Sequence, residues 1–322
     1  MGRILNVASV AIATTCASLP GADGTMLVSL LATTSHGCSD ETMKKQELLD
    51  IATSHRLKFL SIDASVEFRQ SGTAQSEFYP KATSRVRVNF FNGNASKIRV
   101  DDSLYTGDEA NPGLVLKALE RTRVWNGNKD TSIVWSVSAS SGLINIDSVR
   151  QMRTQTQMQE FFNANLLNDT AENTAGMPSR SVVSILSSTW TSIREAPELV
   201  NGRECRVADW MNPVSGEIQI SVWIDPERGC VPLKQTLPRM TYESVDIAEI
   251  TPGIWVVTKA KKTTQLGGDK PVDGEIEVLR HESGALKVDL NSDIDDQVFE
   301  PALPDDYQLV ENGVLIRMGK DD

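Results

Sequence analysis

Residues 217–225 read E-I-Q-I-S-V-W-I-D, with an apolar side chain at every second position. Successive side chains of a β-strand point to opposite faces of the sheet. Ile218, Ile220, Val222 and Ile224 therefore share one face of a strand, and the residues between them, most of which are polar, share the other. This pattern predicts an antiparallel sheet with one apolar face, which another part of the chain must cover.

The same period of two residues returns before and after this segment, so the predicted fold class is mainly β (α+β). Turn sequences such as Asn92-Gly93 and Asp225-Pro226 lie between the strands. The sequence contains no internal repeat or linker, and residues 39–322 are therefore expected to form a single domain. The predicted strands are 62–68, 86–90, 98–100, 133–137, 203–211, 216–225, 231–237, 242–250, 254–262, 274–281, 285–290 and 307–318.

A helix is expected at the start of this domain. Asp40 and Glu41 suit its first turn, where negative charges interact favourably with the helix dipole. Leu48, Ala52 and His55 follow at helical spacing. Because His55 lies on this apolar stripe, we expect it to be packed or half exposed rather than to act as a ligand.

Two further helices are predicted in the middle of the chain. The first starts at a capping box formed by Ser148 and Gln151, and the second follows a polar loop that ends at Pro178. Both have an apolar stripe with the period of a helix, so both are expected to pack against the sheet. The stripe residues are Met158, Phe162 and Leu166 in the first helix and Val182, Leu186 and Trp190 in the second.

The composition is typical of a soluble globular protein, because 40% of the 322 residues are hydrophobic and 23% are charged. The 43 Asp and Glu residues outnumber the 32 Lys and Arg residues, which gives a net charge of −11. Such an acidic surface repels phosphate backbones, and the sequence has no basic stripe with interleaved aromatic residues. Nucleic acid is therefore not an expected partner.

The first 38 residues differ from the rest of the chain. Arg3 precedes the apolar run 4–19, and small residues follow, which is the layout of a secretory signal. An uncleaved anchor, or a true start at Met26, is the alternative. Residues 1–38 are therefore expected to be an export signal and leader, and the protein is expected in the periplasm or cell envelope.

Cys38 follows Ser35-His36-Gly37, and small residues before a cysteine are typical of a lipid-modified bacterial cysteine. No Leu stands three residues upstream, which departs from that pattern. Membrane anchoring through Cys38 therefore stays open. Cys205 and Cys230 could form a disulfide in an oxidising compartment, or they could be two buried thiols that never meet.

The sequence contains no recognisable catalytic motif. His36, His55 and His281 are scattered, whereas zinc ligands are clustered. The nucleophile elbow, the P-loop and the dinucleotide-binding fingerprint are absent from the sequence. We therefore expect no enzyme activity, no cofactor and no metal. A secreted hydrolase that uses dispersed carboxylates is the remote alternative, because an acidic chain always offers pairs of them.

Acidic residues within 289–300 have the spacing of a calcium-binding loop. Ile294 occupies the position where such a loop requires glycine, and no amphipathic helix flanks the segment. A solvated acidic loop is therefore the expected structure.

Four segments follow one another in an order known from one group of proteins. They read V-N-G-R-E-C at 200–205, V-W-I-D-P-E-R-G-C-V-P-L at 222–233, G-I-W-V at 253–256 and F-E-P-A-L-P-D-D at 299–306. Together with the exported N-terminus and the central pair of apolar helices, they resemble the LolA-like superfamily of lipoprotein carriers. Asp306 stands where that group usually has Gly, and the residues at the mouth of a carrier cannot be matched one by one.

The resemblance implies an incomplete antiparallel β-barrel wrapped around a few helices. It also implies a non-enzymatic role, in which a lipid or lipoprotein acyl chain enters an apolar space between sheet and helices and gains about 0.8 kcal/mol per buried CH₂ group. The alternative is a sensory or protein-interaction module of the same fold, with a filled core and an envelope protein as partner. The residues expected to line the space are Met158, Phe161, Phe162, Leu166, Leu167, Val182, Leu186 and Trp190.

Overall fold

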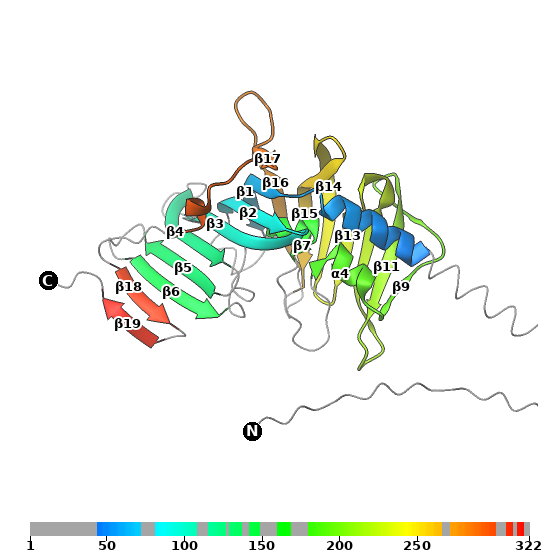
Figure 1. The fold of residues 1–322 in the computed structure, drawn as a ribbon, viewed down its shortest axis with the longest axis horizontal. Coiled ribbons are helices and arrows are strands. Elements are labelled where there is room, and N and C mark those ends of the chain that lie inside the picture. The colour runs from blue at the N-terminus through cyan, green and yellow to red at the C-terminus, as the bar shows by residue number, and fades with distance from the viewer. Residues whose placement is uncertain are drawn as a thin grey trace, which may run out of the picture. The chain divides into compact units, whose positions relative to one another are not determined.

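The structure is a computed structural model in which the chain forms one large sheet with a few short helices (Figure 1). The residues that it describes are 44–71, 81–107, 115–126, 129–136, 142–148, 160–168, 180–265, 271–300, 307–311 and 314–318. Three predicted features lie outside the described part of the chain. They are the leader 1–38, Met158, and the capping box, of which Gln151 and the side chain of Ser148 are not described.

Strands β1 to β6 form an antiparallel meander in which each strand pairs with the next. The turn between β2 and β3 is Asn92-Gly93, with positive φ angles of 51° and 76°. A two-residue hairpin requires this backbone, and Asn-Gly adopts it readily. The strands are β1 (Ser61–Ser71), β2 (Lys81–Phe91), β3 (Asn94–Gly107), β4 (Val115–Asn126), β5 (Lys129–Ser136) and β6 (Gly142–Ser148).

A second antiparallel meander runs from β11 to β16. At its edge, β11 also pairs with two short strands, β9 and β10. The predicted strand bounds are confirmed here to within a few residues. The strands are β9 (Thr191–Ile193), β10 (Glu198–Val200), β11 (Arg203–Met211), β12 (Ile218–Asp225), β13 (Val231–Leu237), β14 (Met240–Thr251), β15 (Ile254–Thr264) and β16 (Val272–Val278).

Strand β1 joins the two meanders, because it pairs antiparallel with both β16 and β17 (Val288–Leu290). The sheet then contains 17 strands. At its other end, β18 (Tyr307–Glu311) pairs in parallel with β6, and β19 (Val314–Met318) pairs antiparallel with β18.

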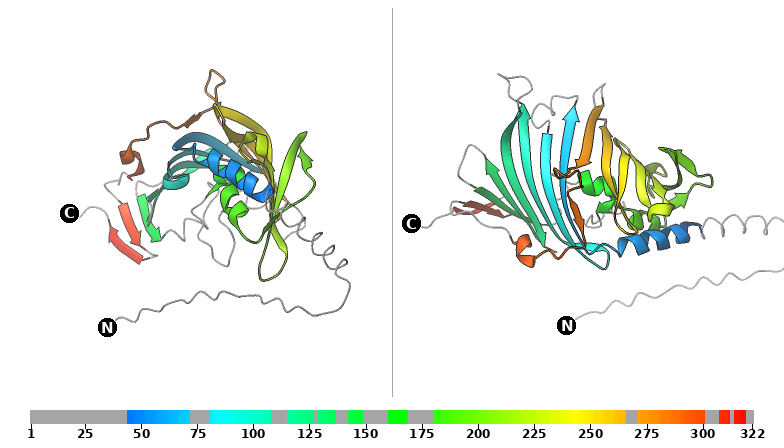
Figure 2. Two further views of the ribbon diagram at one scale, coloured as in Figure 1. Left: turned by 45° about the vertical axis from the view of Figure 1, so that its right-hand side comes forward. Right: turned by 90° about the horizontal axis from the view of Figure 1, so that it is seen from above.

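Among the described strands, no pairing joins the end formed by β9 and β10 to the end formed by β19. The sheet therefore curves without closing, as Figure 2 shows. The predicted incomplete antiparallel barrel is confirmed, and β6–β18 is the parallel exception among the described pairings.

Helices lie on the concave face of this sheet (Figure 2). The first helix covers residues 44–56. Two more, α3 and α4, are held together by the short paired strands β7 and β8, and two 3₁₀ helices, η2 and η3, lie in loops. Their bounds are α3 (Glu160–Asn165), β7 (Leu167–Asn168), β8 (Arg180–Ser181), α4 (Val182–Ser187), η2 (Pro226–Arg228) and η3 (Asp296–Phe299).

The concave face carries two apolar clusters. One joins β1, β2, β3 and β14–β16 to the phenylalanines of α3. The other joins β9, β11 and β12 to helix 44–56 and α4. Ile220, Val222 and Ile224 of β12 belong to the second cluster, as their alternation predicts, whereas Ile218 at the start of the strand is 57% exposed.

The opposite face of β11 and β12 is not simply polar. A third cluster lies there, with Trp223 and Val207 as members. Beside it, Arg194 Nε and Nη2 donate to both carboxylate oxygens of Asp209 at 2.7 and 3.0 Å, and Ser221 Oγ donates to the same carboxylate at 2.6 Å. Such bidentate bonding satisfies a carboxylate that is itself buried.

Helix α4 is shorter than its apolar period suggests. It ends at Ser187, and the next residue, Ser188, is extended (φ −67°, ψ 133°). Ser187 Oγ donates to Val183 O at 2.7 Å, which is the kind of side-chain competition that weakens a helix end. The period of four residues continues to Trp190, but the helix does not.

Candidate functional site

The candidate site is the interior between the concave face and a helical plug, defined here as residues 160–168 and 180–187. Ser181 caps α4, because its Oγ accepts a hydrogen bond from Ser184 N at 3.1 Å. The pairing of β7 with β8 fixes α3 and α4 next to each other. Each helix has only six residues, so tertiary packing rather than helix propensity must hold the plug in place.

Six of the residues predicted to line an apolar space are buried between plug and sheet. Phe161, Phe162 and Leu167 belong to the cluster of β1–β3 and β14–β16. Leu166, Val182 and Leu186 belong to the cluster of β11 and β12. The prediction that they line a ligand space stays a prediction, because these side chains pack against the protein's own sheet.

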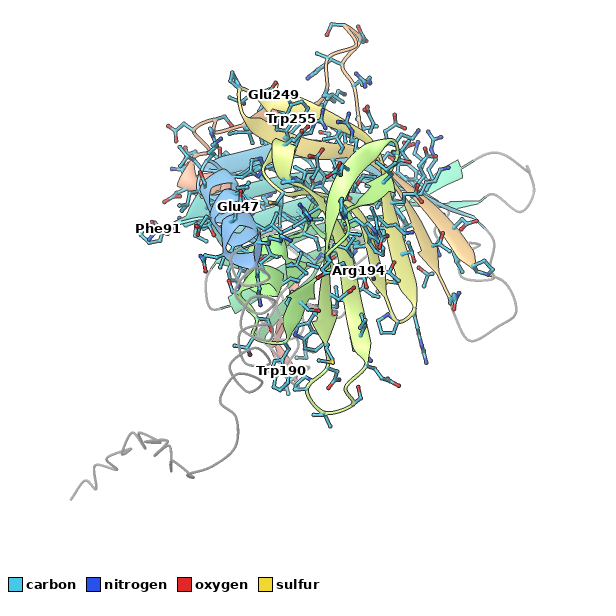
Figure 3. The ribbon with its side chains drawn as sticks, turned by 90° about the vertical axis from the view of Figure 1, so that its right-hand side faces the viewer. Glu47, Phe91, Trp190, Arg194, Glu249 and Trp255 are labelled. Carbon is cyan, nitrogen blue, oxygen red and sulfur yellow. The ribbon has the colours of Figure 1, made fainter. Side chains whose placement is uncertain are left out.

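Trp190 requires a correction. Its side chain is 47% exposed and lies beyond the end of α4, just before β9. Figure 3 shows it at the lower end of the green strands, away from the interior. The reason is the helix end at Ser187, which removes Trp190 from the helical stripe.

The plug is also fixed by polar contacts inside the protein. Glu160, which is only 5% exposed, accepts hydrogen bonds from Tyr242 Oη and from Lys262 Nζ, both at 2.6 Å. Lys262 also lies 5.8 Å from the ring centroid of Tyr242 and 5.8 Å from that of Phe68. These groups form a latch between α3 and strands β14 and β15.

A second contact fixes the end of α3. Asn165 Oδ1 accepts from Val257 N at 2.7 Å, and Asn165 Nδ2 donates to Val257 O at 3.2 Å. The pairing of β15 with β16 begins only at Lys259, so no described strand pairs with this part of the β15 edge. The asparagine side chain takes the place of one.

The first helix contributes to the same edge. His55 Nε2 accepts from Trp255 N at 3.2 Å, two residues before Val257. Burial, together with the nearby cations Lys58 and Arg56, lowers the pKa of His55 to about 4, so the ring is neutral and able to accept. His55 is therefore a packed histidine, as its place on the apolar stripe predicts.

Gly229 makes room for that ring. A Cβ atom at this position would collide with the imidazole of His55, and the backbone has φ +67°. Glycine alone combines this backbone with no side chain. Arg56, the residue after His55, also contacts the plug. Its Nη2 donates to Leu167 O at 2.8 Å, and its guanidinium lies 4.6 Å from the ring centroid of Phe90.

A small cavity is lined by described residues of the interior. The cavity between helix 44–56, the plug and β15 has a volume of about 30 Å³. One water molecule occupies about 30 Å³ in the liquid, and pockets for small ligands measure about 300–1,000 Å³. Its lining includes His55, Leu166, Val182, Cys230 and Trp255.

Sequence patterns do not identify the partners in the latch or in the asparagine contact. Glu160 and Asn165 flank an apolar stretch, and polar residues inside a predicted buried helix can indicate specific partners. The partners themselves lie 82, 92 and 102 residues away along the chain, and no local pattern identifies them.

Cys205 and Cys230 are not joined by a disulfide, and both thiols are buried. Cys205 belongs to the cluster on the outer face of β11, whereas Cys230 packs with helix 44–56 on the concave side. Because the two clusters lie on opposite faces of the sheet, the two thiols lie on different sides of it. The sequence leaves two possibilities open, a disulfide or two separate buried thiols, and the structure contains two separate buried thiols.

Asp102 is one of four described carboxylates whose pKa is shifted, together with Glu198, Asp225 and Glu275. Asp102 on β3 is buried, and this burial raises its pKa although Arg121 and Arg123 lie 3.1 and 3.7 Å away. Ser84 Oγ donates to it at 2.9 Å. These contacts place Asp102 in an ion cluster with Arg121 and Arg123 on the inner face of β2–β4.

The segment with calcium-loop spacing does not wrap around a centre. Asp289 lies in β17, and Asp295 caps η3 by accepting from Gln297 N at 2.9 Å. Across the described residues, no group of His, Cys, Asp and Glu is arranged to hold a metal ion. Within the same part of the chain, no helix combines the length and the apolar character needed to span a membrane.

A scan against protein-family models finds no match, and a search of the curated proteins finds none either. Solved structures do match. A candidate outer membrane lipoprotein-sorting protein domain from Vibrio parahaemolyticus is 11% identical, with a TM-score of 0.46, and the match covers 78% of this chain and 95% of that one.

Two further structures are similar. A DUF1329 family protein from Desulfovibrio piger is 12% identical, with a TM-score of 0.44, over 79% of this chain and 96% of that one. The MucA/MucB complex of Pseudomonas aeruginosa gives a TM-score of 0.20 at 11% identity, over 78% of this chain and 100% of the other. Because all these TM-scores are below 0.5, the function of this chain is argued from its own residues.

Proposed function

We propose that this chain is a non-enzymatic, exported protein of the cell envelope that acts by binding a protein partner. Its interior is then a structural core, filled by its own helical plug. The observation that carries this proposal is the small size, about 30 Å³, of the cavity between helix 44–56, the plug and β15, which has room for one water molecule but not for an acyl chain.

The contacts of the plug support the same view. Glu160 is held by two hydrogen bonds and Asn165 by two more, all to β14 and β15. Buried polar groups with satisfied partners specify one arrangement of a core. A plug that is held in this way hinders the entry of a ligand into the interior. The outer surface and the edges of the sheet are better placed to bind a protein partner.

An acyl-chain carrier, which the resemblance implies, is the second candidate. It is favoured by the apolar contact between plug and sheet, which involves Phe161, Phe162 and Leu186 among others. In that case α3 and α4 would have to move away from the sheet, and a chain would replace their side chains at about 0.8 kcal/mol per buried CH₂ group.

Native mass spectrometry of the protein purified from membranes separates the two candidates. A filled core predicts no non-covalently bound lipid, so the native mass equals that of the denatured chain, whereas a carrier predicts an additional lipid mass that is lost on denaturation. A fluorescent fatty acid gives a second measurement, and we expect no saturable binding to the native chain.

Two variants make the fatty acid result specific. Leu186→Trp enlarges a side chain inside the interior, whereas Leu199→Trp enlarges one that is 75% exposed. Saturable binding that Leu186→Trp abolishes and Leu199→Trp preserves would establish the carrier and refute the filled core.

A further inference from the structure

Four exposed apolar side chains lie at one end of the β11–β12 hairpin. Their exposed fractions are 47% for Trp190, 39% for Met211, 91% for Val214 and 57% for Ile218. We call these four residues the Trp190 patch. Single exposed apolar residues are normal in proteins, but a group of them marks an interaction surface.

Backbone contacts bring the four residues together. Met211 N donates to Trp190 O at 3.0 Å, and Met211 pairs with Ile218 across the hairpin. Val214 lies in the connecting turn, which is closed by a hydrogen bond from Gly216 N to Asn212 O at 2.8 Å. Figure 3 shows Trp190 beside the lower end of this hairpin.

The patch is apolar, nearly uncharged and formed around a turn. Within residues 187–192 and 211–218, Glu217 is the only charged residue, although 23% of the chain is charged. Val214, at 91% exposed, projects from the turn rather than lining a groove. A projecting apolar turn with a tryptophan beside it suits the boundary between lipid headgroups and acyl chains.

The patch also lies at the start of the described chain. Lys45, in the first turn of helix 44–56, donates from Nζ to Ser188 O at 2.7 Å and to Thr191 O at 2.8 Å, on either side of Trp190. Lys45 is seven positions after Cys38, the cysteine at which the sequence leaves a lipid anchor open. Seven residues span at most about 25 Å, so a chain anchored there would keep this end of the sheet close to the membrane.

We propose that the Trp190 patch is a membrane-docking surface that inserts into the interface of a lipid bilayer. The occupant is the lipid interface itself, and the interior of the protein is not involved. Docking there would orient the curved sheet on the membrane with its N-terminal helix next to the bilayer.

A dye on the turn tests this proposal. The full chain carrying Cys16→Ser, Cys38→Ser and Val214→Cys is labelled with an environment-sensitive fluorophore, since Cys205 and Cys230 are buried. Vesicles of phosphatidylcholine and phosphatidylglycerol (3:1) are then added. We expect the emission at position 214 to shift to the blue, because the dye enters a less polar environment.

The matched control is Leu199→Cys in the same background. Leu199 is 75% exposed on β10, which pairs with the opposite end of β11. We expect no shift at position 199. An unchanged emission at 214, or equal shifts at 214 and 199, would overturn the proposal.

Flotation of unlabelled full-length chain with the same vesicles gives an independent measurement. Trp190→Ser with Ile218→Ser should lower the vesicle partition coefficient about tenfold or more, which corresponds to about 1.4 kcal/mol or more, because two apolar side chains no longer insert. Leu199→Ser should leave it unchanged. A shift at position 214 that needs no vesicles and grows with protein concentration would instead indicate a second copy of the chain on the patch, which also contradicts the proposal.

Discussion

The side-chain amide of Asn165 binds both the N–H and the C=O of Val257, at 2.7 and 3.2 Å, as a neighbouring strand would. Together with His55, which accepts from Trp255 N, it completes an edge of β15 that β16 leaves unpaired. Unpaired backbone groups in a protein interior are rare because each lacks the hydrogen bond that water would supply. The plug and the first helix therefore supply this part of the sheet with hydrogen-bond partners in addition to apolar contacts.

Replacing Asn165 by Ala should destabilise the protein by about 2–4 kcal/mol, because two buried backbone groups lose their partner. The measurement is urea unfolding followed by circular dichroism. The control is Asn291→Gly: Asn291 makes a similar pair of bonds, to Leu60 N and Lys58 O, but at an exposed position with φ 58° that glycine tolerates. Equal losses in the two variants would contradict the role of burial.

The latch at Glu160 can be tested by a double-mutant cycle. Glu160→Gln keeps an acceptor for Tyr242 but leaves the Lys262 ammonium, whose side chain is 17% exposed, without its carboxylate. Breaking a buried pair by removing one partner costs about 3–5 kcal/mol, and this partly open site should lie at or below the lower end. Adding Lys262→Met should restore a large part of the loss. If the double variant loses as much stability as the two single variants together, the residues are not coupled.

His55 should make the stability of the protein depend on pH. Its pKa is about 4 in the folded chain and 6.5 in the unfolded chain. Between these values the unfolded state binds a proton that the folded state does not, so stability falls as the pH falls from about 6.5 to about 4. The loss from this group is about 1.4 kcal/mol per pH unit and about 3 kcal/mol in total.

The pH effect is isolated by comparison with His55→Gln, which keeps an acceptor for Trp255 N and cannot titrate. Unfolding free energies of both proteins are measured from pH 7 to pH 4. The native chain should lose more stability over this range than the variant. Parallel curves would mean that His55 is protonated equally in both states.

Much of this fold could be predicted from alternation alone. Ile220, Val222 and Ile224 are buried on one face as their period of two requires, and Leu48 and Ala52 of the first helix are buried against them. The open edge of the sheet followed from the resemblance and is confirmed by the strand pairing. Such signals are local, because a strand or a helix repeats its own pattern.

The candidate site was less predictable, for two physical reasons. The helical period of Val182, Leu186 and Trp190 takes no account of Ser187 and Ser188. Their hydroxyl groups bond to the backbone at Val183 O and Trp190 N, and the helix ends before Trp190. Partners such as Asn165 and Val257 are 92 residues apart, and only the folded sheet brings them together.

The last prediction concerns the two thiols of the sheet. Burial raises the pKa of Cys230 to about 12 and that of Cys205 to about 11. The thiolate is the reactive form, and at pH 8 it would be on the order of 0.01% of Cys230 and 0.1% of Cys205. In a chain with Cys16→Ser and Cys38→Ser, native protein should therefore react very slowly with a disulfide reagent that releases a coloured thiol.

Unfolding in urea without a reductant should expose two rapidly reacting thiols. A count of zero after unfolding, recovered to two by prior reduction, would show that Cys205 and Cys230 are joined in the isolated protein and that the sheet must bring its two faces together there.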